Sequence, residues 1–213
     1  MARQQGLKIL RVISGQAKGH PLRAVPGNGT RPTTDKVKEA LFSMIGPYFD
    51  EEERVLDLFA GSGGLGIEAL SRGAGSAVFV DSSPQSVDVV RRNLESTKLA
   101  GKASVYRNDA RRALKVLEKS GLPFDLIFLD PPYAMKDCNA ILTEIAQRGL
   151  AADSAIAVVE HHPDVSYPEA FEGFIRTRCA KYGEIAVSIY RYEPNQEAPA
   201  GTTMETTEEA NKR

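Results

Sequence analysis

The sequence predicts an α/β fold built around a mostly parallel, seven-stranded sheet. Beyond Arg54, short apolar stretches alternate with amphipathic helical stretches, which is the pattern of βαβ units with helices on both faces of a sheet. Near the end, two β-rich stretches are separated only by Tyr182-Gly183, so we expect a C-terminal antiparallel hairpin. Between Leu7 and Val25, two extended stretches flank a Gly-rich basic turn, which predicts a small N-terminal β-hairpin extension.

The elements follow in order along the chain. A first helix is expected to start at the N-caps Thr33–Asp35 and to end at Gly46-Pro47. Five parallel strands are expected at Arg54–Phe59, Ala77–Val80, Ala103–Arg107, Phe124–Leu129 and Ala155–Glu160. Helices are expected between them at Leu65–Ser71, Pro84–Leu99, Arg111–Lys119 and Cys138–Arg148. The antiparallel pair is expected at Phe174–Ala180 and Glu184–Tyr192.

The last residues, Pro194–Arg213, lack hydrophobic periodicity and are rich in Thr and Glu, so we expect a disordered acidic tail. The chain then divides into three parts. These are a basic hairpin extension at residues 1–30, the main domain at 31–193 and the tail at 194–213.

Charge is unevenly distributed along the 213 residues. Apolar residues make up 42% and charged residues 26%, as in an ordinary soluble globular chain. The net charge of −1, from 27 basic and 28 acidic residues, gives no hint of a polyanionic partner. Residues 1–34, however, contain no acid, whereas glutamates dominate from Glu193 onward. The basic start is therefore a hypothesis about an anionic partner.

Several classes of protein are disfavoured by composition. No apolar run approaches the roughly 20 residues that span a bilayer, and the start lacks the apolar stretch of a secretory signal. Cys138 and Cys179 stand outside any CxxC or Cys/His cluster and are expected to be small core hydrophobes. The three histidines lack metal-ligand spacing, and His161 and His162 are expected to pack at the surface. The chain is thus expected to be cytoplasmic and metal-free.

Carboxylates follow the first four predicted parallel strands. They are Asp57, Asp81, Asp109 and Asp130, and each spacing fits one βα unit. In an open α/β sheet, ligands bind outside the carboxyl ends of the strands. We therefore expect these four side chains at one binding edge.

A Gly-rich loop follows the first parallel strand. Gly61, Gly63 and Gly66 satisfy GxGxxG, a weak signal shared by NAD, FAD and S-adenosylmethionine sites. Asp81 is placed to accept hydrogen bonds from ribose hydroxyls. Asp57 would repel a pyrophosphate but would favour the ammonium and sulfonium of S-adenosylmethionine. The loop therefore favours S-adenosylmethionine as cofactor.

The fourth strand ends in Asp130-Pro131-Pro132-Tyr133, which suits methylation of an exocyclic amine. Such a nitrogen is a poor nucleophile because its lone pair is delocalised into the heterocycle. The Asp130 carboxylate and the Pro131 carbonyl can accept its two hydrogens, and the prolines preset the loop. Tyr133 offers a face on which an extruded base can stack. Catalysis would then rest mostly on positioning and electrostatics, and the amine would attack the methyl group directly without a covalent enzyme intermediate.

These motifs resemble a known family. Asp57–Gly66 together with Asp130–Tyr133 is similar to the Rossmann-like S-adenosylmethionine-dependent methyltransferases that carry [DN]PP[YFW]. Arg11–Gly15, Arg31–Phe42 and Lys181–Gly183 further resemble the bacterial RsmD family. That resemblance covers about Leu7 to Tyr192. It implies methylation of the N2 amine of one guanine in 16S ribosomal RNA, with the RNA presented in a small-subunit particle to a monomeric enzyme.

The resemblance also assigns the site residues. Catalysis falls to Asp130, Pro131, Pro132 and Tyr133. Cofactor binding falls to Asp57, Phe59, Ala60, Gly61, Ser62, Gly63, Asp81, Ser82, Asp109 and Ala110. RNA contact falls to Arg11, Lys18, Arg23, Arg31 and Thr33, with His20, Lys36 and Lys38 in the same basic set.

Other functions remain open at this point. Within the class, the acceptor could be adenine N6 or cytosine N4 in DNA, or a glutamine side chain. Cytosine-C5 methylation is disfavoured because neither cysteine follows a proline in the catalytic loop. An NAD-dependent oxidoreductase would use the same glycines, although Asp57 counts against it. A third alternative is an RNA-binding protein that has kept the methyltransferase fold but has no catalytic activity.

Overall fold

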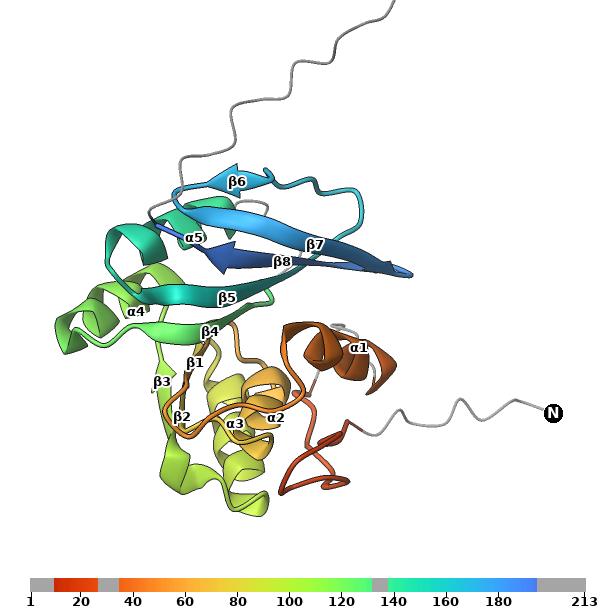
Figure 1. The fold of residues 1–213 in the computed structure, drawn as a ribbon. Coiled ribbons are helices and arrows are strands. Elements are labelled where there is room, and N and C mark those ends of the chain that lie inside the picture. Colours follow the sequence, from red (N-terminus) through yellow and green to blue (C-terminus); the bar gives the residue numbers. More distant parts are fainter. Residues whose placement is uncertain (1–9, 27–34, 132–137, 195–213) are drawn as a thin grey trace, which may run out of the picture.

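A single eight-stranded sheet organises the protein (Figure 1). The computed structural model describes residues 10–26, 35–131 and 138–194. The strands are β1 (Arg54–Asp57), β2 (Ser76–Asp81), β3 (Ala103–Arg107), β4 (Phe124–Leu129), β5 (Ala151–His161), β6 (Ala170–Phe171), β7 (Phe174–Tyr182) and β8 (Ile185–Tyr192). Their order is β3-β2-β1-β4-β5-β8-β7-β6. The pairs from β3 to β5 are parallel, and β8, β7 and β6 add antiparallel strands, as the sequence predicts for the C-terminal hairpin.

Helices cover both faces of the sheet. They are α1 (Asp35–Ile45), α2 (Gly64–Ser71), α3 (Pro84–Ser96), α4 (Ala110–Leu117) and α5 (Cys138–Gln147), with short 3-10 turns at Ala100–Lys102 and Glu118–Ser120. One hydrophobic cluster joins the sheet to α1, α2 and α3, and a second joins it to α4 and α5. Figure 1 shows these two groups of helices on opposite sides of the strands. The three-layer α/β architecture is therefore confirmed.

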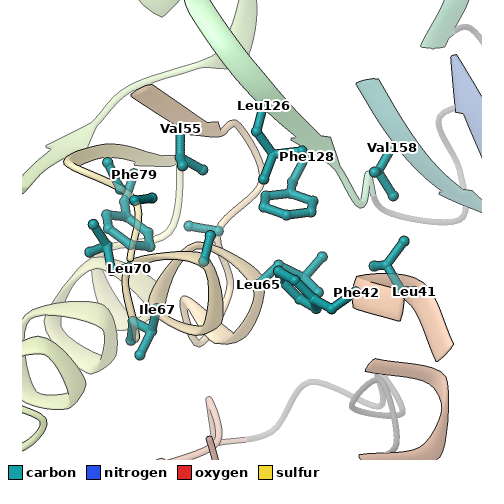
Figure 2. Packing of buried hydrophobic residues seen from close by; sticks show 14 of the residues in the cluster. Leu41, Phe42, Val55, Leu65, Ile67, Leu70, Phe79, Leu126, Phe128 and Val158 are labelled. Carbon is teal, nitrogen blue, oxygen red and sulfur yellow. The ribbon is translucent and has the colours of Figure 1, made fainter. Parts of the chain in front are cut away.

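Helix α1 packs against the centre of the first cluster. In Figure 2, Leu41 and Phe42 of α1 reach toward Phe128 of β4 and Val158 of β5. The Phe42 and Phe128 ring centroids are 5.9 Å apart, and both side chains are completely buried. This packing places α1 close to the carboxyl ends of β4 and β5.

Two details of the sheet differ from the sequence prediction. The sheet has eight strands rather than seven, because β6 pairs Ala170 and Phe171 with Ile175 and Phe174. A two-residue strand is too short to show a period-two pattern, so only its partner strand defines it. Cys138 is fully buried, but Cys179 is exposed on β7, so its expected place in the core is wrong. Strand β7 lies one strand from the sheet edge.

The N-terminal segment, residues 10–26, folds back on itself but forms a single antiparallel bridge, between Arg11 and Pro21. The Val12 amide donates to the His20 carbonyl at 2.9 Å, and the Leu22 amide donates to the Leu10 carbonyl at 2.7 Å. The predicted hairpin is therefore present as a turn with few ladder bonds, not as two regular strands. The apolar side chains of Leu10, Val12 and Leu22 join the first cluster.

A buried glutamate, Glu68 of α2, holds this segment in place. Its carboxylate accepts the amides of Ile13 and Ser14 at 2.8 and 2.9 Å. It also pairs with Arg72 Nε at 2.8 Å and with Lys38 Nζ at 3.3 Å. Lys38 is 1% exposed, so the expectation that it belongs to the RNA-facing basic set is wrong. Together with Arg72, Lys38 compensates the buried charge of Glu68.

The segment also approaches α2 more closely than a side chain would allow. Gly15 has φ of +80°, and a Cβ there would lie 1.7 Å from the Ser71 carbonyl oxygen. The Ser71 hydroxyl donates to the Ser14 carbonyl at 2.6 Å and accepts the Ala17 amide at 3.0 Å. Residues 10–26 are thus an integral part of this layer. The expected boundary at residue 30 lies outside the described residues, and so does the expected tail at 194–213 except for Pro194.

Candidate functional site

The carboxyl ends of β3, β2, β1 and β4 are neighbours, so their acids meet at one edge. Asp57 ends β1, Asp81 ends β2, Asp109 follows β3, and Asp130 follows β4. The spatial order of these strands is β3-β2-β1-β4, and all three pairings are parallel. The sequence prediction that consecutive strands deliver carboxylates to a common edge is confirmed.

Asp81 organises the start of the Gly-rich loop. Its Oδ2 accepts the Gly61 amide at 2.9 Å, and its Oδ1 accepts the Ser83 amide at 2.8 Å. Gly61 has φ of +52°, and a Cβ there would find no atom nearer than the Phe59 carbonyl oxygen at 4.0 Å. Asp81 therefore fixes the loop through the Gly61 amide, while the space around the Gly61 Cα stays open. This openness lets a ligand approach the backbone closely.

Asp57 lies beneath the same loop. It is 2% exposed, and its Oδ2 accepts the amide of Gly66 at 3.1 Å. A Cβ on Gly66 would lie 2.4 Å from the Phe79 ring and 3.1 Å from that carboxylate oxygen, so only glycine fits here. Burial, opposed by the Gly66 hydrogen bond and assisted by Asp81, raises the pKa of Asp57 to about 7. A cation at this edge would favour its ionised form.

The remaining cofactor candidates are distributed around this loop. Asp109 is exposed and caps α4 by accepting the Arg112 amide at 3.2 Å, with Ala110 buried as the first helical residue. Ala60 and Gly63 are buried, Phe59 and Ser62 are half-buried, and Ser82 is exposed. The structure thus gathers every cofactor candidate at the ends of β1, β2 and β3. Their contacts with a ligand stay predictions.

A buried amide that sequence reasoning missed fixes the loop from α3. The Asn93 side chain donates to the Ser62 carbonyl at 2.8 Å and to the Arg23 carbonyl at 3.0 Å. It also accepts the Arg23 amide at 2.8 Å. The sequence did hint at this role, because Asn93 lies among the apolar residues of α3 and a polar side chain buried there needs hydrogen-bond partners. Asn93 couples the N-terminal segment to the Gly-rich loop.

Asp130 lies where β4 ends, with a second carboxylate beside it. The last parallel pairs of β4 and β5 are Phe128 with Val158 and Leu129 with Val159, so Asp130 and Glu160 come next on their chains. The protein atoms that surround Asp130 raise the pKa of its carboxyl well above its ordinary value by desolvation, although the residue is exposed at the surface. The charges of Glu160 and Asp57 raise it further.

Glu160 was not singled out from the sequence. The signal was present, because it occupies the carboxyl end of the fifth predicted strand, as the four aspartates do for the first four. Pro131, the next member of the catalytic motif, is half-buried. Pro132 and Tyr133 lie outside the described residues.

The basic candidates of the N-terminal segment are at the surface. Arg11 keeps 55% of its side chain exposed while its Nε donates to Asp35 at 2.8 Å, and Lys18 and Arg23 are exposed. Arg31 and Thr33 lie outside the described residues. His161 is a packing residue, as expected, because its ring nitrogens bond the His162 carbonyl and the Ser188 hydroxyl, each at 2.9 Å.

The described residues hold neither a candidate metal cluster nor a candidate membrane span. They contain no group of three or more His, Cys, Asp or Glu side chains that could hold a metal ion. None of the described helices is both long enough and apolar enough to cross a membrane.

Comparison with known proteins identifies relatives along almost the whole described chain. A family model described as "Conserved hypothetical protein 95" matches residues 10–191. A Bacillus subtilis (strain 168) protein named "Putative rRNA methyltransferase YlbH" is 50% identical over 182 residues, covering 85% of this chain and 98% of that protein. Ribosomal RNA small subunit methyltransferase D of Escherichia coli (strain K12) is 32% identical over 191 residues, covering 90% and 94%.

A solved structure agrees with these matches. The structure titled "Putative methyltransferase yhhF from Escherichia coli" superposes with a TM-score of 0.74 at 32% identity, covering 87% of this chain and 98% of that one. The fold is therefore the Rossmann-like methyltransferase fold that the sequence motifs predicted.

Proposed function

The chain belongs to the RsmD family of ribosomal RNA methyltransferases, and on that premise we propose that it methylates the exocyclic N2 amine of one guanine in small-subunit ribosomal RNA. The methyl donor is S-adenosylmethionine. We further propose that the enzyme works in the cytoplasm as a monomer on a protein-bound small-subunit particle. The observation that carries the proposal is the position of Asp130, one strand from Asp57 and the Gly-rich loop, in a chain of this family.

The residues at the ends of β1 and β2 fit this cofactor. The open backbone at Gly61 lets an adenosine approach, and Asp81 presents a carboxylate at the distance along the chain that ribose recognition requires. Asp57 adds negative charge for a ligand that carries an ammonium and a sulfonium. When bound, S-adenosylmethionine supplies an electrophilic methyl group on its sulfonium.

The acceptor side supplies hydrogen-bond acceptors for an amine. Asp130 and the Pro131 carbonyl accept the two N2 hydrogens, which turns the nitrogen lone pair toward the methyl carbon. S-adenosylmethionine held at Asp57, Gly61 and Asp81 would supply the methyl, and the electron pair of the S–C bond would stay on sulfur as the N–C bond formed. The extra proton on nitrogen passes to Asp130 and then to solvent. The raised pKa of Asp130 makes its carboxylate a better proton acceptor.

RNA is proposed to bind across the N-terminal segment. Arg11, Lys18 and Arg23 are exposed there, and Asn93 and Glu68 hold the segment against the methyltransferase layer. Cations fixed in this way position a phosphate backbone without reading its sequence. The guanine would then enter at Asp130, with Tyr133 as its stacking partner.

The salt dependence of RNA binding tests this surface. Replacing Lys18 and Arg23 with Ala should weaken binding and reduce the slope of log affinity against log salt by about 1 to 2. The control replaces Lys115 and Lys119, which are exposed on or next to α4, on the opposite face of the sheet. If the slope does not change in the Lys18 and Arg23 variant, these residues do not contact RNA.

The acceptor is tested by mapping methylated nucleotides in small-subunit RNA from cells lacking the gene, before and after adding purified protein and S-adenosylmethionine. One N2-methylguanine should be missing and should return on addition. Its presence in the deletion strain would refute the assignment. Methylation of DNA or of a protein glutamine instead would support the other amine acceptors. Binding of NAD in place of S-adenosylmethionine would indicate an oxidoreductase, and cofactor binding with no transfer would indicate an inactive protein.

A further inference from the structure

Glu160 shares a face of the sheet with Asp130. Side chains alternate along a strand, so Asp130 continues the side of Phe128, and Glu160 that of Val158. Phe128 and Val158 both belong to the cluster beneath α1 and α2, and they are partners in the β4–β5 register. Glu160 also pairs with Val187 of β8, which lies in the same cluster. The two carboxylates therefore extend side by side from adjacent strands at the acceptor site already described.

Their mutual effect agrees with this placement. Among the described residues, the charges that act on Asp130 are those of Glu160 and Asp57, and both disfavour its ionised form. Adjacent acids of this kind gain most from a ligand that offers a hydrogen-bond donor to each of them.

Only one of the amine-bearing bases offers two adjacent donors of that kind. Guanine presents the N2 amine next to the N1 hydrogen. In adenine the N6 amine stands next to N1, and in cytosine the N4 amine stands next to N3, and both of these ring nitrogens are acceptors. A carboxylate beside the ring nitrogen therefore attracts guanine and repels the other two bases. Enzymes that extrude a base read this edge by hydrogen bonds.

We propose that Glu160 is a specificity-determining residue that accepts the N1 hydrogen of the target guanine while Asp130 accepts a hydrogen of the N2 amine. This inference rests on the proposed function and names the group that would select guanine. Misreading is costly because an acceptor that faces another acceptor forms no hydrogen bond with it, and the two lone pairs repel each other.

The test replaces the modified guanine with 2-aminopurine, which keeps the N2 amine but has an acceptor at N1. The RNA is made by ligation and, where naked RNA is not methylated, is assembled into small-subunit particles. Wild-type protein should prefer guanine by about 10- to 100-fold in kcat/KM. Glu160→Gln should gain activity on 2-aminopurine relative to guanine, because the glutamine amide can donate to an N1 acceptor as well as accept from an N1 hydrogen. The preference should fall at least about tenfold.

Controls separate this effect from structural damage. Glu52→Gln changes an exposed glutamate in the turn before β1, at the opposite edge of the sheet, and should keep the wild-type preference. S-adenosylmethionine affinity and the unfolding midpoint are measured for each variant. Glu160→Ala should reduce the preference for guanine without the gain on 2-aminopurine, because alanine neither accepts nor donates.

The outcomes distinguish the two proposals. If wild-type protein methylates no guanine in either RNA or particle, the proposed function fails. If it methylates guanine and 2-aminopurine equally well, the proposed function stands and the role of Glu160 is overturned without any variant. If it discriminates but Glu160→Gln keeps the full preference, another group reads N1, for example Asp130 acting on both donors. That result also overturns the proposal.

Discussion

The two halves of the ligand-binding edge use their carboxylates differently. At the ends of β1, β2 and β3, each acid accepts a backbone amide of the loop that follows: Asp57 from Gly66, Asp81 from Gly61 and Ser83, and Asp109 from Arg112. At the ends of β4 and β5, Asp130 and Glu160 lie on adjacent strands, and the charge of Glu160 raises the pKa of Asp130. The cofactor half is thus pre-formed by the chain itself. The acceptor half instead brings two acids together on adjacent strands, where we propose that the substrate offers a hydrogen-bond donor to each.

Cofactor binding and methyl transfer can therefore be altered separately, although both occur at one edge of the sheet. Changes in the cofactor half should act on stability and on cofactor affinity together, because the same bonds serve both. Changes in the acceptor half should act on transfer and selectivity alone.

The largest effect is expected for Asp130→Ala. Losing the acceptor that positions the amine and takes its proton should reduce kcat by about 10³-fold or more, since each such contribution is worth about 10²- to 10⁴-fold. The affinity for S-adenosylmethionine, measured by calorimetry, should stay within about threefold. Asp153→Ala, at an exposed site near the amino end of β5, is the matched control. If cofactor affinity falls as much as kcat does, Asp130 contributes to cofactor binding and the distinction between the two halves is wrong.

Gly66→Ala should damage the cofactor half through its packing. The added methyl would lie 2.4 Å from the fully buried Phe79 ring, and the strain should exceed the helix propensity gained. We expect a loss of about 1 to 3 kcal/mol in the free energy of unfolding, with weaker cofactor binding. Urea unfolding measures it. Gly101→Ala, where a Cβ meets nothing within 4 Å, should be nearly neutral, and equal behaviour of the two variants would contradict the packing argument.

Asp81→Asn should have a smaller effect on the same half. An amide can accept only one of the two backbone amides that Asp81 now accepts, and it binds ribose hydroxyls less strongly. Cofactor affinity should fall by about 10- to 100-fold. Asp88→Asn, an exposed acid on α3, should change nothing. A purely structural role would show as a lower unfolding midpoint with unchanged affinity.

The mildest test varies pH. The pKa of folded Asp57 is about 7 against an ordinary 3.8, so the folded protein holds a proton that the unfolded chain releases between these values. Stability should therefore fall as pH rises from about 4 to about 7. A cationic cofactor favours the ionised form, so its affinity should rise by up to about tenfold per pH unit below 7 and then level off. Asp57→Asn should flatten both profiles, and unchanged profiles would remove Asp57 as their cause.

Much of the cofactor half could be predicted from the sequence because its interactions are local. A strand, a glycine turn and a helix follow one another within residues 54–71, and the carboxylate at each strand end has a fixed distance along the chain to the next. Such spacing can be read directly from the sequence. The motif at Asp130 could be found for the same reason.

The contacts that sequence analysis missed join distant parts of the chain. Lys38 resembles a surface cation until α1 is seen to bury it against Glu68, and Asn93 resembles an ordinary helical residue until it meets Arg23 and Ser62. In both cases the partner lies about 30 or more residues away. Hydrophobic periodicity reports burial of a face but not the identity of the polar group that is buried with it.

The α/β class, the parallel strands, the Gly-rich loop and the acids at the strand ends could all be predicted from the sequence, because each depends on periodicity or on spacing within one βα unit. The packing of residues 10–26 against α2 and the position of Glu160 next to Asp130 became visible in the folded structure. Those facts depend on strand register and on close packing, which bring together residues whose separation along the chain carries no signal of their contact.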